Sequence, residues 1–286
     1  MASNPKPLDT PHTASLAHLD WNGRPISLEY QWVGDPDSSM PVVVFLHEGL
    51  GSISMWKDYP EQFCRAFGFK GLVYSRYGHG HSTPRPRDEL PQMDFMHRQA
   101  TELLPALLRH LGISRPWLFG HSDGASIALI FAARLPDQLA GAVVVAPHIL
   151  VEDLTVAGIA AARPVYEQGG RGMRAGLARY HADVDSVFYG WNDVWLKPEF
   201  RQWSIEDELK NITCPLLAVQ GENDEYGTME QVKGIARRVP HAKIVALSDC
   251  GHSPHRDQPE ALTREAGNFI ISQLPGRPAQ PDSRDK

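Results

Sequence analysis

Residues 117–124 read WLFGHSDG, and this stretch decides the fold. Its first three residues are typical of a buried strand, and Asp123–Leu135 reads as a helix of small residues that stops before Pro136. A G-x-S-x-G match is common by chance, but between a strand and a helix its glycines leave room for a strained turn. We therefore interpret Ser122 as a nucleophile. The alternative is a solvated serine in a glycine-rich turn.

Five more apolar runs have the length of a strand: Val42–Leu46, Gly71–Tyr74, Ala142–Val145, Leu216–Val219 and Ile244–Leu247. They read as fully buried strands, apolar on both faces, which is typical of a mostly parallel sheet covered by helices on both sides. Before them, Ser15–Asp20 and Ile26–Val33 flank Asn22-Gly23, which predicts an antiparallel hairpin.

Helical patterns alternate with these strands. Besides Asp123–Leu135, the predicted helices are Phe95–Leu111, Met229–Val239 and Pro259–Leu274. The alternation predicts an α/β fold with a doubly wound, mostly parallel sheet, and ligands are expected beyond the carboxyl ends of its strands.

No buried strand is predicted between Ala146 and Leu216. This part of the chain holds eight aromatic residues: Tyr166, Tyr180, Phe188, Tyr189, Trp191, Trp195, Phe200 and Trp203. A structureless loop of this length is uncommon, so we interpret residues 149–203 as a helical lid. The predicted organisation is a core of residues 14–148 and 204–274, that lid, and flexible ends at 1–13 and 275–286.

Composition excludes several classes of function. The 286 residues are 42% hydrophobic and 22% charged, with a net charge of −6, which gives no electrostatic reason to bind nucleic acid or an anionic membrane. We recognise no secretory signal and no membrane-spanning run, and three cysteines are too few for a disulfide framework. The expectation is a cytoplasmic protein, monomer or homodimer, with a small-molecule substrate.

With Ser122 in this context, the sequence resembles the α/β-hydrolase fold family from about Ser15 to Leu274. The resemblance implies an eight-stranded sheet, a lid after the sixth strand, and a triad in the chain order serine, acid, histidine. Asp224 follows the Leu216–Val219 strand and His252 follows the Ile244–Leu247 strand, at the family's positions for acid and base. In such a triad, the histidine takes the serine proton and the acid orients the histidine.

Alternatives to both residues lie nearby. Glu222 and Glu225 are candidate acids off the family position, and an acid at Glu152 or Asp153, after the Ala142–Val145 strand, is a known family variation. His255 is a second candidate base, but it lies beyond Pro254 and is expected at the surface.

Two backbone N–H groups are expected to form an oxyanion hole: that of Asp123 and that of Gly49, with Leu50 as the alternative to Gly49. Many family members have His-Gly at the start of this loop, whereas this chain has His47-Glu48. The Glu48 carboxylate is expected to point away from the hole and be paired. The alternative is that Glu48 binds a cationic or hydroxylated part of the substrate.

The function implied is a serine hydrolase acting on a small, largely apolar ester or thioester, with Tyr189, Trp191 and Trp195 forming an apolar substrate pocket. One alternative is C–C bond hydrolysis of aromatic ring-fission products, and a distant one is a non-catalytic ligand receptor on the same fold. The family's epoxide hydrolases and haloalkane dehalogenases have an aspartate as nucleophile, whereas this chain has Ser122, which argues against both of these activities. No cofactor is expected, and no metal, since His79 and His81 have no acidic or cysteine cluster beside them.

Overall fold

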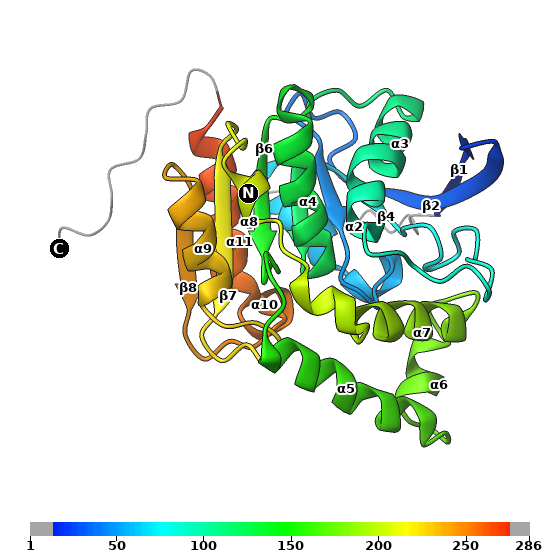
Figure 1. The fold of residues 1–286 in the computed structure, drawn as a ribbon. Helices are drawn as coiled ribbons and strands as arrows, with labels where there is room; N and C mark the ends of the chain where they lie inside the picture. The colour runs from blue at the N-terminus through cyan, green and yellow to red at the C-terminus, as the bar shows by residue number, and fades with distance from the viewer. Residues whose placement is uncertain (1–13, 275–286) are drawn as a thin grey trace, which may run out of the picture.

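An eight-stranded sheet forms the centre of the molecule (Figure 1). The computed structural model describes residues 14–274, so the expectations for 1–13 and 275–286 fall outside the described residues. The spatial order is β1-β2-β4-β3-β5-β6-β7-β8, and every pair from β4 to β8 is parallel. The predicted doubly wound, mostly parallel sheet is confirmed. Its strands are β1 (Ser15–Trp21), β2 (Arg24–Gly34), β3 (Val43–Leu46), β4 (Lys70–Tyr74), β5 (Trp117–His121), β6 (Gly141–Val145), β7 (Leu216–Gly221) and β8 (Lys243–Leu247).

The first two strands form the expected antiparallel hairpin. Trp21 pairs with Arg24 across a two-residue turn, in which Asn22 and Gly23 have φ angles of 56° and 79°. Both values lie in the left-handed region that asparagine and glycine tolerate best, which is why this dipeptide favours such a turn.

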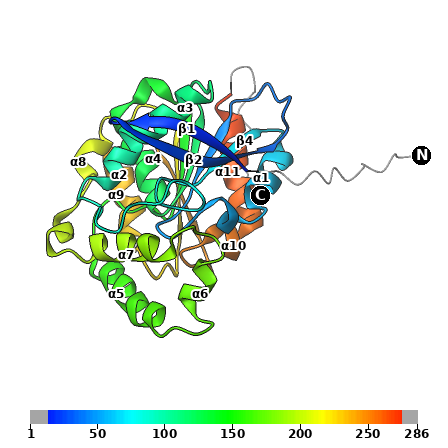
Figure 2. The same ribbon diagram turned by 90° about the vertical axis from the view of Figure 1, so that its right-hand side faces the viewer.

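Side chains alternate between two cores on opposite faces of the sheet. Val44 and Leu118 belong to one cluster, and Val43 and Phe119 to the other. Figure 2 shows the helices divided in the same way. The first cluster is covered by α2 (Phe95–Arg98), α3 (Leu104–His110), α4 (Asp123–Arg134) and α9 (Glu230–Arg238), and the second by α1 (Tyr59–Phe67) and α11 (Pro259–Ser272).

Two elements differ from the sequence prediction. Of the strand expected to be fully buried, Ile244–Leu247, only Leu247 is buried, because β8 is an edge strand with a neighbour on one side. The helix expected over Phe95–Leu111 is interrupted between α2 and α3 by a π-helical turn at Gln99–Leu103. Pro105 has no N–H to donate to the carbonyl one turn earlier, which accounts for the irregular turn.

Residues 146–215, hereafter the β6–β7 segment, contain α5 (Asp153–Glu167), α6 (Met173–Leu177), α7 (Val184–Trp195), a 3₁₀ turn (Pro198–Gln202) and α8 (Glu206–Leu209). In Figure 1, α5, α6 and α7 lie together below the sheet. They share a small core, in which the rings of Tyr166 and Phe188 stack with centroids 3.6 Å apart. None of the helices between residues 14 and 274 is long and apolar enough to cross a membrane.

Gly141 offers a test of how tightly the sheet is packed. A Cβ atom there would lie 2.4 Å from the Trp117 ring and 2.9 Å from the Pro215 carbonyl oxygen, and Trp117 is buried. Gly141→Ala should therefore lower the free energy of unfolding by about 1–3 kcal/mol, measured by urea denaturation. Gly176→Ala on α6 is the control, because its Cβ would meet nothing within 4 Å. Equal effects of the two substitutions would contradict the packing described.

Candidate active site

Ser122 occupies a sharp turn between β5 and α4. Its φ and ψ angles are 53° and −120°, a conformation that non-glycine residues rarely adopt. A Cβ at Gly124 would lie 2.1 Å from the Leu46 carbonyl oxygen, and one at Gly120 would lie 2.3 Å from the Gly124 carbonyl oxygen. The two glycines therefore allow α4 to pack this close to β3 and β5. The turn leaves the Ser122 side chain at the carboxyl end of the sheet.

Ser122, His252 and Asp224 form one chain of hydrogen bonds. Ser122 Oγ lies 2.9 Å from His252 Nε2, and His252 Nδ1 lies 2.9 Å from both carboxylate oxygens of Asp224. Because a carboxylate only accepts, Nδ1 carries the proton and Nε2 is free to accept from the serine. A neutral imidazole held in this way can take the proton of a serine during attack on a carbonyl.

The Asp224 carboxylate is fixed at the end of β7. It accepts hydrogen bonds from the backbone N–H groups of Tyr226 (2.8 Å) and Gly227 (3.1 Å) and from Gln220 Nε2 (2.7 Å). Burial acts to raise the pKa of Asp224, but the hydrogen bonds from His252 and the Tyr226 N–H outweigh it and lower that pKa below its usual value. Asp224 is therefore ionised at neutral pH.

The other candidate acids hold the backbone rather than the His252 ring. Glu225 accepts from the backbone N–H of His252 at 3.1 Å, and Glu152 accepts from Thr228 and Gln231. The Asp153 side chain is 92% exposed and pairs with Arg201, and Glu222 is exposed. Among these acids, only Asp224 contacts the imidazole.

The expectation that His255 lies at the surface is wrong. Pro254 begins a short helix, α10 (Pro254–Asp257), which turns the chain inward. The buried His255 ring packs against Trp56 and His121, with centroids 5.0 and 4.9 Å away. Burial lowers the pKa of His255 to about 2, so the ring stays neutral.

A cavity of about 200 Å³ adjoins Ser122 and His252. The expected residues Glu48, Gly49, Leu50, Trp191 and Trp195 line it, but Tyr189 lines a different cavity. Trp195 also packs against Phe200 and Trp203, with centroids 5.0 and 6.1 Å away, so its ring serves the core as well. The remaining lining residues are Met55, Asp123, His148, Thr155, Ile159, Met173, Leu177 and Tyr226.

His148 is a lining residue that the sequence analysis missed. It follows β6, and its ring centroid lies 5.7 Å from that of His252. Burial lowers the pKa of His148 to about 3, so the ring adds no positive charge beside His252 at neutral pH. Its position just beyond the carboxyl end of a predicted buried strand was the available signal.

Three histidines hold three successive carbonyl groups of the loop after β3. His47 Nδ1 donates to the Glu48 carbonyl (2.7 Å), His79 Nε2 to that of Gly49 (3.0 Å) and His181 Nε2 to that of Leu50 (2.9 Å). Arg76 Nη2 also donates to the Glu48 carbonyl, at 2.9 Å. His181 comes from the β6–β7 segment, and its Nδ1 accepts the Gly80 N–H at 2.9 Å.

This arrangement leaves N–H groups available beside Ser122. The backbone N–H groups of Gly49, Leu50 and Asp123 donate to no other group in residues 14–274. Asp123 is the first residue of α4, where N–H groups have no partner within the helix and the helix dipole favours negative charge.

Two carboxyl groups lie at the wall of the cavity. The Glu48 carboxylate lies 3.8 Å from His121 Nδ1, and although burial acts to raise its pKa, interactions with His121 and His255 leave that pKa at about 2. Burial raises the pKa of Asp123 to about 6, although the charge of Arg76 acts in the opposite direction. Glu48 is therefore both paired and part of the cavity wall, and both groups are negative above about pH 7.

The raised pKa of Asp123 has a consequence for stability. The folded protein binds this proton more tightly than the unfolded chain, so ionisation of Asp123 destabilises the fold as the pH rises from about 4 to about 6. Asp123→Asn removes this loss. The unfolding free energy of the variant minus that of wild type should therefore be larger at pH 7 than at pH 4, by on the order of 2 kcal/mol.

Urea denaturation at the two pH values measures this difference. Asp153→Asn is the control, because its side chain is 92% exposed and should shift little. A variant-to-wild-type difference for Asp123→Asn that does not change with pH would mean that Asp123 titrates normally.

Known proteins resemble this chain along most of its length. Mouse sn-1-specific diacylglycerol lipase ABHD11 is 24% identical over 306 residues, which covers 94% of each chain. The 2-hydroxy-6-oxo-6-phenylhexa-2,4-dienoate hydrolase of Comamonas testosteroni is 22% identical over 254 residues, 80% of this chain and 87% of that one. The crystal structure of VinJ superposes with a TM-score of 0.71 and 26% identity, over 92% of this chain and all of that one (100%).

A model of the alpha/beta hydrolase family matches residues 43–265. The match runs from β3 into α11 and includes Ser122, Asp224 and His252. Because it covers more than half of the chain, and the sheet order and the hydrolase relatives agree with it, this protein belongs to the alpha/beta hydrolase family.

Proposed function

We propose that this protein is a serine hydrolase that cleaves a small, largely apolar carboxylic ester or thioester through an acyl-enzyme on Ser122. The observation that carries the proposal is the hydrogen-bonded chain from Ser122 Oγ through His252 to Asp224, at 2.9 Å for each contact. The relatives support hydrolysis as the general reaction.

In the first step, Ser122 Oγ attacks the carbonyl carbon while its proton passes to His252 Nε2. Asp224, ionised and bonded to Nδ1, stabilises the imidazolium that forms. When the tetrahedral intermediate collapses, the imidazolium returns the proton to the departing alcohol or thiol, leaving the acyl group on Ser122. Water, deprotonated by His252 in turn, then releases the carboxylic acid.

The negative oxygen of the intermediate needs donors already in place. The N–H groups of Asp123 and of Gly49, with Leu50 as the alternative, have no acceptor within residues 14–274 and serve as this oxyanion hole. Carbonyls of residues 48–50 are held by His47, His79 and His181, which keeps the loop from rotating its N–H groups away. Preorganised donors of this kind lower the barrier because they need not reorient during the reaction.

The cavity favours neutral or cationic acyl groups. Glu48 and Asp123 are both negative at slightly alkaline pH, and in a small, partly desolvated cavity they repel a carboxylate on the substrate. This charge disfavours the C–C hydrolase alternative, since the dienoate in the name of the Comamonas testosteroni relative is itself an anion. The apolar wall from Ile159, Leu177 and Trp191 suits an acyl chain.

Residues 149–203, which lie within the β6–β7 segment, are proposed to act as the lid. Thr155 and Ile159 on α5, Met173 and Leu177 on α6, and Trp191 on α7 all line the cavity, so the three helices cover Ser122 from the solvent side. Excluding water there strengthens the electrostatic contacts to the reacting group.

Ser122→Ala tests the proposal directly. The variant should lose p-nitrophenyl hexanoate hydrolysis by on the order of 10³-fold or more in kcat while keeping its fold, because no nucleophile remains. Ser54→Ala, an exposed serine, is the control and should keep full activity. Wild-type enzyme should hydrolyse the hexanoate ester faster than mono-p-nitrophenyl adipate, which adds a carboxylate to the acyl chain.

A fluorophosphonate identifies the nucleophile independently. Peptide mapping of the labelled enzyme should find the phosphonyl group on Ser122. A label on another serine would sink the assignment, and a preference for the adipate ester would refute the charge argument while leaving the nucleophile in place.

His181 should act as a positioning residue. His181→Ala frees the Leu50 carbonyl, so the loop N–H groups lose alignment and kcat should fall by about tenfold with a smaller change in KM. His181→Gln, whose amide can still donate to that carbonyl, should recover part of the loss. Tyr180→Phe on the same stretch is the control, since the Tyr180 hydroxyl accepts a hydrogen bond from Lys57 and not from residues 48–50. A change in KM alone would exclude a role in aligning the loop.

A further inference from the structure

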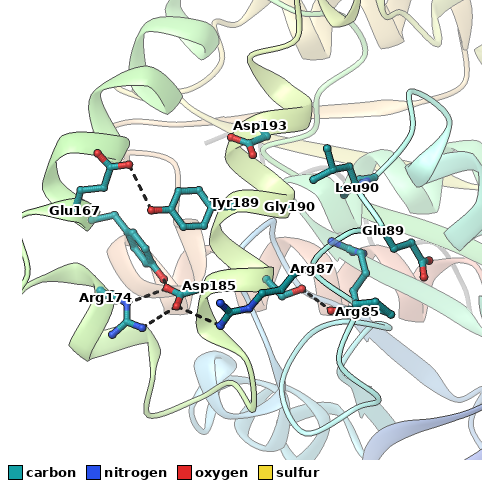
Figure 3. Close-up of a pocket in the computed structure, with 14 residues that line it drawn as sticks. Arg85, Arg87, Glu89, Leu90, Glu167, Arg174, Asp185, Tyr189, Gly190 and Asp193 are labelled. Atoms are coloured by element: carbon teal, nitrogen blue, oxygen red, sulfur yellow. Dashed lines mark hydrogen bonds and ion pairs between the residues drawn. The ribbon is translucent and has the colours of Figure 1, made fainter.

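A second cavity lies apart from Ser122. Its volume is about 460 Å³, and it opens between residues 85–91, which follow β4, and the helices α5, α6 and α7 (Figure 3). It shares no lining residue with the cavity at Ser122. We call it the Arg85 cavity, after the arginine that lies between its two walls.

The carboxylates of this cavity mostly have partners already. Asp185 binds Arg174 through two contacts of 2.8 Å and also accepts from the Tyr166 hydroxyl at 2.6 Å, and Figure 3 shows Arg87 directed at it from the other side. Glu89 is paired with Arg24. Asp185 and Glu89 therefore pair with cations other than Arg85.

Among the described residues, Arg85 has no such partner. Its guanidinium makes no hydrogen bond and no ion pair within residues 14–274, and the dashed line beside it in Figure 3 ends on its carbonyl oxygen, which accepts from Ser186 Oγ at 2.9 Å. Glu89 and Tyr77 attract its charge from beyond contact distance. A largely desolvated guanidinium stays protonated, and leaving it unpaired is unfavourable.

The backbone around Arg85 is shaped to hold the guanidinium in place. A Cβ at Gly190 would lie 2.3 Å from Arg85 Nη1, and one at Gly78 would lie 3.2 Å from Nη2. Glycine at both positions therefore leaves room for the planar guanidinium of Arg85 between α7 and the turn that follows β4. The bond from Ser186 fixes the Arg85 backbone to the same helix.

We propose that the Arg85 cavity binds a small organic carboxylate, whose two oxygens pair with the Arg85 guanidinium and whose apolar body lies against Tyr189 and Leu90. The planar fork of a guanidinium matches the two oxygens of a carboxylate. A monoanion is favoured over a phosphate dianion, because Glu89, Glu167 and Asp185 also line the cavity and repel a second negative charge.

The ligand is a molecule distinct from the acyl group at Ser122. A void of only about 20 Å³ shares lining residues with both cavities: Arg85 and Gly190 also line the Arg85 cavity, and Gly49, Asp123 and Trp191 also line the cavity at Ser122. That volume holds about one water molecule and no acyl chain. A bound carboxylate joins residues 85–91 to α7, the helix that carries Trp191, and so stabilises the β6–β7 segment.

Benzoate is the probe, with benzamide as its uncharged counterpart of the same shape. Binding to the full-length protein is measured by isothermal titration and by saturation-transfer NMR, before and after Ser122 is phosphonylated. Benzoate should bind both forms alike, and more tightly than benzamide. Arg85→Met should weaken benzoate binding by about tenfold or more, since it removes a bidentate, charge-assisted pair.

Matched variants separate this site from a general charge effect. Arg87→Met should change benzoate binding far less, because Arg87 is exposed and already pairs with Asp183 and Asp185. Arg85→Lys keeps the positive charge but loses the planar guanidinium, so it should weaken benzoate binding less than Arg85→Met does. It replaces Arg85→Met in the test if that variant does not fold. Gly190→Ala should also weaken binding, because it displaces the guanidinium.

The proposal would be overturned by a lack of benzoate binding to wild type, by binding that survives Arg85→Met and Arg85→Lys unchanged, or by equal affinity for benzamide. Loss of binding on phosphonylation would place the carboxylate at Ser122 instead and likewise refute it. Benzoate binding is measured without catalysis. A negative binding result therefore does not contradict the proposed reaction at Ser122, and a negative labelling result at Ser122 does not prevent the binding test at Arg85.

Discussion

The strained backbone at Ser122 is the constraint on which the candidate site depends. A left-handed φ at a non-glycine residue costs about 1–3 kcal/mol and persists only where the surroundings hold it. Here the Ser122 N–H donates to the Val145 carbonyl at 2.9 Å, and Gly120 and Gly124 allow β5, α4 and β3 to meet closely. The turn sets Ser122 Oγ where the ends of β7 and β8 bring Asp224 and His252, and it leaves the first N–H of α4 unpaired beside them.

Charge is distributed differently in the two cavities. At Ser122 the wall holds the carboxyl groups of Glu48 and Asp123, whereas the second cavity holds the guanidinium of Arg85, which has no partner within residues 14–274. Trp191 on α7 lines both the cavity at Ser122 and the small void next to it, and a Cβ added at Gly49 would lie 2.3 Å from its indole. Because electrostatic interactions are strong in such desolvated spaces, the two cavities should select ligands of opposite character. The α7 helix borders both, which makes it the element through which they can influence each other.

Local sequence patterns predicted the structure well where the residues of one element determine it. They predicted burial less well where burial depends on which elements pack beside it. The hairpin at Asn22-Gly23 and the buried strands around β5 follow from turn chemistry and apolar runs. An apolar run such as Ile244–Leu247 looks the same whether its strand is central or at the edge, and only the strand order exposes it. His255 was expected at the surface because it follows a proline, yet α10 folds it against Trp56. Tyr189 and Trp191 are two residues apart on α7 and therefore point in different directions, toward different cavities.

By itself, the sequence determined the fold class, the strand–turn–helix context of Ser122 and the placement of Asp224 and His252 after successive strands, because these depend on residue type and short-range periodicity. Only the tertiary structure decided which acid contacts the imidazole: Asp224 does, whereas Glu225 accepts from the His252 backbone N–H and Glu152 accepts from Thr228 and Gln231. It also decided the histidine contacts that hold residues 48–50 and the isolation of Arg85. Those arise from groups up to 131 positions apart in sequence, as for His181 and Leu50, and long-range contacts of this kind leave no periodic signal in the chain.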